Sequence, residues 1–241
     1  MRITQADIEA NIPALQQAIR ALTRYQREEL AEWILNSGEF EDFIAETVLG
    51  WGVSAERHTL TVEEFLAIEA GSAIRHEYIG GEMFEMRPPM PRHELIVSNL
   101  LGLLREREQV GSSPATFVAA NVGLRLRMDN TDLFYRPDIM VSDVTAAERN
   151  VPYVTDPRII VEVFSPITED IDRREKALNY RRIATLDEYL LIAQRSPRVI
   201  IFRRSDEWSP IELTAPDAIV ESRSLAMGLS LRNIYAGTSL R

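Results

Sequence analysis

The sequence predicts a mixed α/β (α+β) fold in which a central mixed sheet is flanked by helices, with a helical extension ahead of it. Two observations support this. Apolar residues recur at helical spacing in the first part of the chain and again in residues 93–108. Beyond residue 116 the apolar runs become short and β-branched, as in Ile159–Phe164, which is typical of strands buried on both faces.

The N-terminal extension is expected to cover residues 1–57 and the main domain residues 58–241. Within the extension, Leu22, Tyr25, Leu30, Trp33 and Ile34 repeat at spacings of three and four and form one apolar stripe. Such a stripe favours a docking or dimerising helix.

The main domain begins with a short helix and a hairpin. Thr61 and Glu64 form the sequence pattern of a capping box, and residues 69–72 end the helix that it starts. Two short alternating runs around Gly80-Gly81 predict a β-hairpin. After a proline-rich break, His93–Glu108 is expected to form a long helix.

The remaining elements are mostly strands. Strands are predicted over 117–120, 122–128, 139–141, 159–164, 189–193 and 199–202. One helix is predicted among them, over 168–183. Together they describe a sheet domain of ordinary size.

Composition excludes several classes of protein. The chain of 241 residues has no cysteine, which excludes disulfides and thiolate metal sites and suits the cytoplasm. No apolar run is long enough to span a membrane, and the start of the chain lacks the pattern of a signal peptide. A net charge of −10 argues against a protein that coats nucleic acid non-specifically, but it is compatible with a nuclease.

Lys176 is the single lysine of a chain in which lysine and arginine together number 27. Arginine stays protonated at any working pH, whereas lysine is a compact cation whose pKa shifts readily. A site that needs a small, tunable cation would keep such a lysine. The alternative is that base composition favours arginine and one lysine merely remains.

Two acidic residues occur where apolar strands are expected. Glu162 lies in the middle of Ile159–Phe164, and Asp138 follows Pro137 at the start of another apolar strand. A buried carboxylate without a partner costs several kcal/mol, so these residues indicate a divalent-metal site. The alternatives are a sheet-edge position or an ion pair with arginine for Glu162, and an ordinary strand-start residue for Asp138.

Asp172, Lys176 and Tyr180 are spaced four apart and therefore share one face of the helix after the Glu162 strand. A surface Asp–Lys pair would explain the spacing. However, the position of Lys176 lets a long side chain reach back over the end of the strand.

These fragments occur in an order that resembles a known family. They are Tyr78–Glu82, His93, Arg136–Ile139, Val161–Pro166, Asp172–Lys176 with Tyr180, and Glu188–Leu190. The set is similar to the Uma-two restriction endonuclease family of the PD-(D/E)xK nuclease superfamily, over roughly three quarters of the chain.

The resemblance implies a restriction-endonuclease-like core and a magnesium- or manganese-dependent endonuclease that acts on DNA. It implies that Asp138, Glu162 and Glu82 are metal ligands and that these three and Lys176 are the catalytic residues. In the wider superfamily the lysine lies two residues after the glutamate, where this chain has Phe164, so the resemblance implies a lysine that has moved to the next helix.

Further expectations concern substrate and partners. His93 opens a helix after prolines, which favours a capping or packing role over catalysis. The sequence leaves open a homodimer formed through the N-terminal helices or the nuclease domain, and a nuclease-fold protein that binds nucleic acid or a partner without cutting. The arginines expected to face DNA phosphates, some of which would be ordinary surface charges, are Arg125, Arg127, Arg136, Arg173, Arg174, Arg181 and Arg182.

Overall fold

The computed structural model describes residues 60–86, 89–110, 116–143, 152–164 and 176–240. The predicted extension over residues 1–57 lies outside these ranges, as do Asp172, Arg173 and Arg174. The described residues divide into two compact units, one holding 60–76 and 81–86 and the other 77–80 and the residues from 89 on. Each unit is described by itself.

The first unit contains α4 (Val62–Gly71) and β2 (Glu82–Glu85). The predicted capping box is present, since the Glu64 N–H donates to Thr61 Oγ1 (3.2 Å) and the Thr61 N–H donates to Glu64 Oε2 (2.8 Å). Strands also flank the predicted Gly-Gly turn, because β1 (His76–Ile79) ends just before it. Gly80 and Gly81 both have positive φ (58° and 100°), which explains why glycine occupies both positions.

The second unit is built on a six-stranded sheet with the order β11-β10-β9-β8-β6-β3. Its strands β8 and β9 run parallel and its other neighbours run antiparallel, so the sheet is mixed as predicted. The strand bounds are β3 Thr116–Ala120, β6 Ile139–Asp143, β8 Ile159–Phe164, β9 Glu188–Ala193, β10 Val199–Arg203 and β11 Ile211–Leu213.

A second group of strands lies beside this sheet. β1 pairs antiparallel with β5 (Thr131–Tyr135), β5 pairs antiparallel with β4 (Gly123–Met128), and β4 pairs parallel with the two-residue β7 (Tyr153–Val154). The C-terminal part adds a short 3-10 helix (Arg204–Asp206), the hairpin of β12 (Ile219–Ser222) and β13 (Met227–Ser230), and α7 (Leu231–Ile234). These C-terminal elements, β5, β7 and β11 were not predicted from the sequence.

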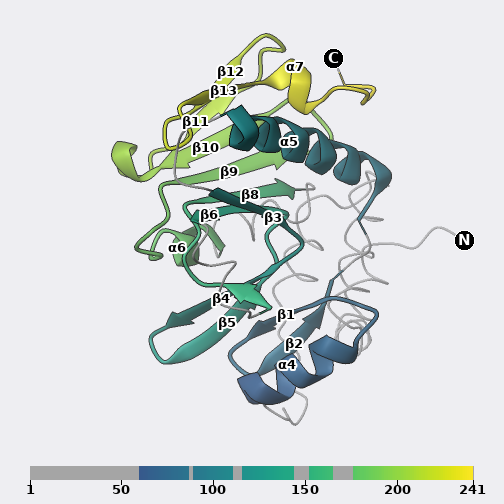
Figure 1. Ribbon diagram of the computed structural model, residues 1–241, viewed down its shortest axis with the longest axis vertical. Coiled ribbons are helices and arrows are strands. Elements are labelled where there is room, and N and C mark those ends of the chain that lie inside the picture. Colours follow the sequence, from purple (N-terminus) through teal and green to yellow (C-terminus); the bar gives the residue numbers. More distant parts are fainter. Residues whose placement is uncertain (1–59, 87–88, 111–115, 144–151, 165–175, 241) are drawn as a thin grey trace, which may run out of the picture. The chain divides into compact units, whose positions relative to one another are not determined.

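Helices lie on both faces of the six-stranded sheet. On one face, α5 (Pro91–Val110) packs against α7, β3 and β8, and Figure 1 shows it beside α7. On the other face, α6 (Ala177–Tyr180) contributes Ala177 and Tyr180 to the core. The predicted helix over 168–183 is thus present over four residues of its described part, and residues 165–175 lie outside the described ranges.

The side chains of β8 separate the core into two clusters. Ile159, Val161 and Val163 belong to the cluster under α5 and α7, whereas Ile160 and Phe164 belong to the cluster that contains Tyr180. Successive side chains of a strand point to opposite faces, so Glu162 is directed to the same side as Ile160 and Phe164. The fold therefore places Glu162 toward α6.

Candidate active site

Glu162 is a buried carboxylate at the centre of the site. All six residues of β8 are buried, and Glu162 has only 5% relative exposure. A carboxylate removed from water in this way needs hydrogen bonds or a cation nearby to remain ionised. The neighbours of Glu162 supply both.

Lys176 is the cation that meets Glu162. Its Nζ lies 3.2 Å from Glu162 Oε1 and 3.0 Å from Glu77 Oε1, and the residue is 8% exposed. The same nitrogen lies 5.7 Å from the centroid of the Tyr135 ring, within the range of a cation–π interaction. The sequence placed the single lysine on the helix that follows the Glu162 strand, and the structure brings the two side chains together.

Glu77 is a site residue that sequence reasoning missed. It lies in β1, is 7% exposed, and its Oε1 accepts the Arg136 backbone N–H at 3.2 Å besides contacting Lys176. The signal was present, because Glu77 immediately precedes the Tyr78–Glu82 fragment on which the family resemblance drew. An acidic residue inside a short buried strand indicates a site residue at Glu77 just as it does at Glu162.

Asp138 lies just before β6 and contacts the backbone of β8. The antiparallel register of these strands begins with the pair Ile139 and Val161. Asp138 Oδ2 accepts the backbone N–H of Val163 at 2.6 Å. This hydrogen bond holds the Asp138 carboxylate at the residue that follows Glu162 in β8.

His93 reaches the same carboxylate from the start of α5. Its Nε2 lies 3.1 Å from Asp138 Oδ1, and its side chain is largely buried. Burial lowers the pKa of the imidazole, but the hydrogen bond and the negative charge of Asp138 outweigh burial, and the pKa of His93 is raised. The sequence favoured a capping or packing role for His93, and in the structure its ring contacts the candidate site residue Asp138.

Tyr180 completes the surroundings of Glu162. Its hydroxyl donates to Glu162 Oε1 at 2.9 Å, and its ring packs edge-on against Tyr135 and Tyr189. Complete burial, followed by the negative charge of Glu162, raises the pKa of Tyr180 well above its ordinary value. Tyr180 consequently stays a hydrogen-bond donor throughout the neutral pH range.

Removing this hydroxyl tests its contribution to stability. We expect Tyr180→Phe to lower the free energy of unfolding by about 2 kcal/mol, because a hydrogen bond to a charged, buried acceptor is lost. Urea denaturation at pH 7 measures the change. An unchanged denaturation midpoint would show that the Tyr180–Glu162 bond does not stabilise the fold.

Comparison with known proteins identifies the family. A family model named Uma2 and described as "Putative restriction endonuclease" matches residues 62–233. The chain belongs to the Uma2 family.

The chain is also similar to individual proteins. Two uncharacterized proteins of Synechocystis sp. are 27% identical over 186 residues and 28% identical over 173 residues. The first match covers 76% of this chain and 95% of the relative, and the second covers 70% and 96%. A crystal structure of "a putative nuclease belonging to DUF820" from Anabaena variabilis superposes with a TM-score of 0.58 at 19% identity, over 73% of this chain and 98% of the other. That likeness establishes a shared fold.

The donor set of this Uma2 chain fits a magnesium ion. Magnesium prefers oxygen ligands and is commonly held by one or two carboxylates, with water and substrate phosphate in its other positions. Asp138 and Glu162 would supply two such carboxylates, since Asp138 accepts the N–H of Val163, the residue after Glu162. Within the described ranges no group of three or more His, Cys, Asp or Glu side chains is arranged to hold a metal.

The fourth predicted catalytic residue, Glu82, lies in β2. It belongs to the first compact unit and is half-buried. Its assignment as a metal ligand stays a prediction.

Several arginines predicted to bind phosphate have partners within the protein. Arg125 donates to Asp132 and to the Tyr153 hydroxyl, Arg181 lies over the Phe202 ring, and Arg182 forms a two-bond ion pair with Asp129. Arg136 donates to the Asn121 carbonyl, and Arg127 is exposed on β4. Several of these arginines are thus engaged within the protein, and their binding to phosphate stays a prediction.

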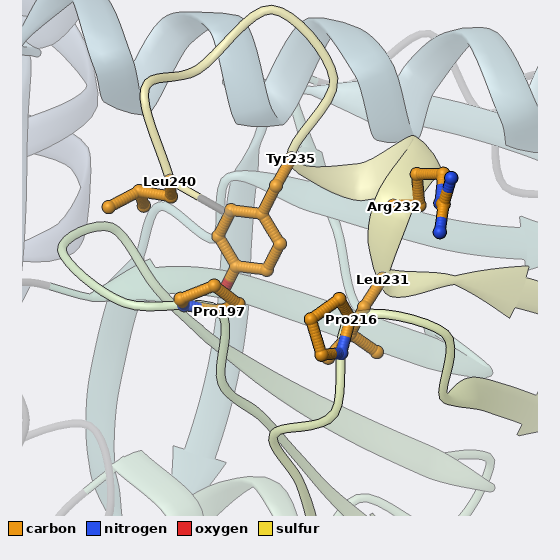
Figure 2. A pocket seen from close by; sticks show the side chains of 6 residues that line it. All are labelled: Pro197, Pro216, Leu231, Arg232, Tyr235 and Leu240. Carbon is orange, nitrogen blue, oxygen red and sulfur yellow. The ribbon is translucent and has the colours of Figure 1, made fainter.

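A cavity of about 330 Å³ lies away from the carboxylates. Figure 2 shows its lining of Pro197, Pro216, Leu231, Arg232, Tyr235 and Leu240. Leu231 and Tyr235 belong to the core cluster under α5 and α7, on the sheet face opposite to Glu162. This cavity is consequently not part of the candidate active site.

Among the residues that the structure describes, no helix is both long and apolar enough to cross a bilayer.

Proposed function

We propose that this protein is a metal-dependent endonuclease that hydrolyses phosphodiester bonds of DNA. The observation that carries the proposal is the contact of Lys176 Nζ with both Glu162 and Glu77, together with the hydrogen bond that holds Asp138 at Val163, the residue after Glu162. A buried ionic cluster is weak evidence of a stabilising role, because replacing it by apolar residues is often neutral or stabilising, so a role in chemistry is the better explanation.

Asp138 and Glu162 would hold a Mg²⁺ or Mn²⁺ ion. When bound, this ion supplies a Lewis acid for the scissile phosphate and lowers the pKa of a coordinated water. Both carboxylates are already oriented by hydrogen bonds, Asp138 by the Val163 N–H and Glu162 by the Tyr180 hydroxyl. Oriented carboxylates bind without the cost of ordering them first.

Lys176 would act on the phosphate or on the attacking water. Its ammonium group is compact and carries three donors, so it can turn from a carboxylate toward a phosphate oxygen and neutralise charge in the transition state. It can also give up a proton at working pH, which an arginine cannot do. Glu77, whose Oε1 lies 3.0 Å from Nζ, would help to keep the ammonium group near Glu162.

Binding of DNA would use arginines on the outer part of the domain. Arg127 and Arg136 are the described candidates, and Arg173 and Arg174 lie three and two residues before Lys176 in the sequence. Cutting both strands of a duplex would require two sites, so we also propose a homodimer, with the residues before 58 as one candidate interface.

The proposal is tested by incubating supercoiled plasmid with the protein and Mg²⁺ or Mn²⁺. We expect the wild type to nick or linearise the plasmid, and Glu162→Ala and Lys176→Ala to do so at least about 100-fold more slowly, as when a charge-stabilising group is removed from other enzymes. No cutting by the wild type, or equal cutting by all three proteins, would favour the alternative of a binding protein without catalysis.

A further inference from the structure

We propose that His93 is a positioning residue, which holds the Asp138 carboxylate in the orientation that binds the metal ion. This inference rests on the proposed function. It assigns to His93 a task beyond packing, because the ring contacts a carboxylate that the proposed function assigns to the metal site.

Both oxygens of Asp138 are held, each from a different element. The Val163 N–H of β8 reaches Oδ2 at 2.6 Å, and His93 Nε2 of α5 lies 3.1 Å from Oδ1. A carboxylate has about four acceptor positions, so each oxygen keeps one for a further partner. The two contacts fix the plane of the carboxylate and leave it able to bind a cation.

The helix that carries His93 is firmly anchored. Ile96, Leu100 and Leu104 of α5 are buried in the core beneath the helix. Asn99 adds two hydrogen bonds, donating through Nδ2 to the carbonyls of Ile234 (3.0 Å) and Ala236 (2.8 Å). The imidazole is therefore presented by a rigid element, as a positioning group requires.

Only one of the two ring nitrogens meets a specific partner. Within the described part of the chain, Nδ1 of His93 is buried and has no hydrogen-bond partner, and the nearest carboxylate oxygen, Glu94 Oε1, is 3.7 Å away. In metal sites of other proteins, removing a residue that orients a metal ligand lowers metal affinity or activity about 10–100-fold. The contact that matters here is therefore the one from Nε2 to Asp138.

Two substitutions of His93 distinguish the effect of where the donor nitrogen lies from the effect of having any polar side chain at this position. In His93→Gln the amide nitrogen ends near the place of Nε2, whereas in His93→Asn it ends near the place of Nδ1. His76→Asn is a control for substitution of another histidine, because His76 Nδ1 lies 2.9 Å from Glu69 Oε2, a carboxylate that is not part of the candidate site, and asparagine keeps an amide nitrogen near the place of Nδ1.

The first readout needs no metal and no activity. The Val163 amide proton, which is bound to Asp138 Oδ2, reports the orientation of the carboxylate through its NMR chemical shift. We expect His93→Asn to move this resonance upfield, and His93→Gln and His76→Asn to leave it near its wild-type position. An unmoved resonance in His93→Asn would overturn the proposal, even if the protein proves to have no nuclease activity.

The second readout is the affinity for Mn²⁺ alone, measured by titration calorimetry. We expect His93→Asn to weaken binding about 10–100-fold, and His93→Gln and His76→Asn to change it less than about 3-fold. Equal loss in His93→Gln and His93→Asn would assign His93 to charge or packing and overturn the positioning role. Failure of the wild type itself to bind Mn²⁺ would instead count against the proposed function, and the Val163 resonance would still decide the role of His93.

Discussion

Replacing Lys176 by arginine is expected to slow plasmid cleavage about 100–1,000-fold, although the charge is preserved. Lys176 Nζ fits between two carboxylate oxygens at 3.0 and 3.2 Å and is buried. The planar, longer guanidinium of arginine cannot occupy the place of a compact ammonium, and it cannot release a proton at working pH. Single-turnover nicking rates in Mg²⁺ measure the effect.

A control on the same helix separates this effect from the addition of an arginine as such. Leu178 lies two residues along from Lys176 and is 63% exposed, so Leu178→Arg introduces the same group on the solvent side of α6. We expect Leu178→Arg to cut at close to the wild-type rate. Wild-type cutting by Lys176→Arg would show that positive charge suffices at position 176 and would remove the special chemistry assigned to the lysine.

The second large effect is on stability. Lys176→Met is expected to lower the free energy of unfolding by about 3–5 kcal/mol, because the removal of one partner from a buried ionic cluster leaves the other charges uncompensated. Here the charges left behind are the carboxylates of Glu77 and Glu162, both of which contact Nζ. Guanidinium denaturation at pH 7, with EDTA present to remove divalent ions, measures the loss.

Neutralising one of the two carboxylates completes a double-mutant cycle. We expect Glu77→Gln to recover part of the lost stability when it is combined with Lys176→Met, because one uncompensated charge is then removed. If the two substitutions destabilise additively, Glu77 and Lys176 do not interact, and Glu77 has no place in the site.

Strands whose residues are buried on both faces could be predicted, because their hydrophobic pattern is local. The apolar runs at β6, β8, β9 and β10 identified the centre of the sheet to within one or two residues. They also singled out Glu162, because a carboxylate is unexpected inside an apolar strand. The place of Lys176 on the helix after the Glu162 strand suggested that its side chain could reach back, but only the structure gives the contact between them.

Elements that depend on turn geometry or on distant neighbours were missed. Asp129 and Asn130 both adopt positive φ (49° and 68°), the geometry of a tight turn between β4 and β5, and an Asp-Asn pair permits it. This turn signal was overlooked, and β5 with it. β7 has only two residues and is defined by its pairing with β4, which no local pattern reveals.

Contacts between elements far apart in the sequence were also out of reach. Glu77 joins the site because β1 pairs with β5, and the continued register places Glu77 opposite Tyr135, whose ring lies near Lys176. His93 joins it because α5 packs across the sheet. Spacing along the chain gives no measure of either approach, and the partners of Arg125 and Arg182 were unpredictable for the same reason.

The central claim is that Asp138 and Glu162 bind a divalent metal that cleavage requires. It is tested most directly by measuring nicking of supercoiled plasmid in EDTA and then across a Mg²⁺ titration, for the wild type and for Asp138→Asn. The account predicts no cutting in EDTA, recovery of the wild-type rate as Mg²⁺ is added, and little or no recovery in Asp138→Asn. Cutting by the wild type in EDTA, or an identical Mg²⁺ dependence in Asp138→Asn, would contradict it.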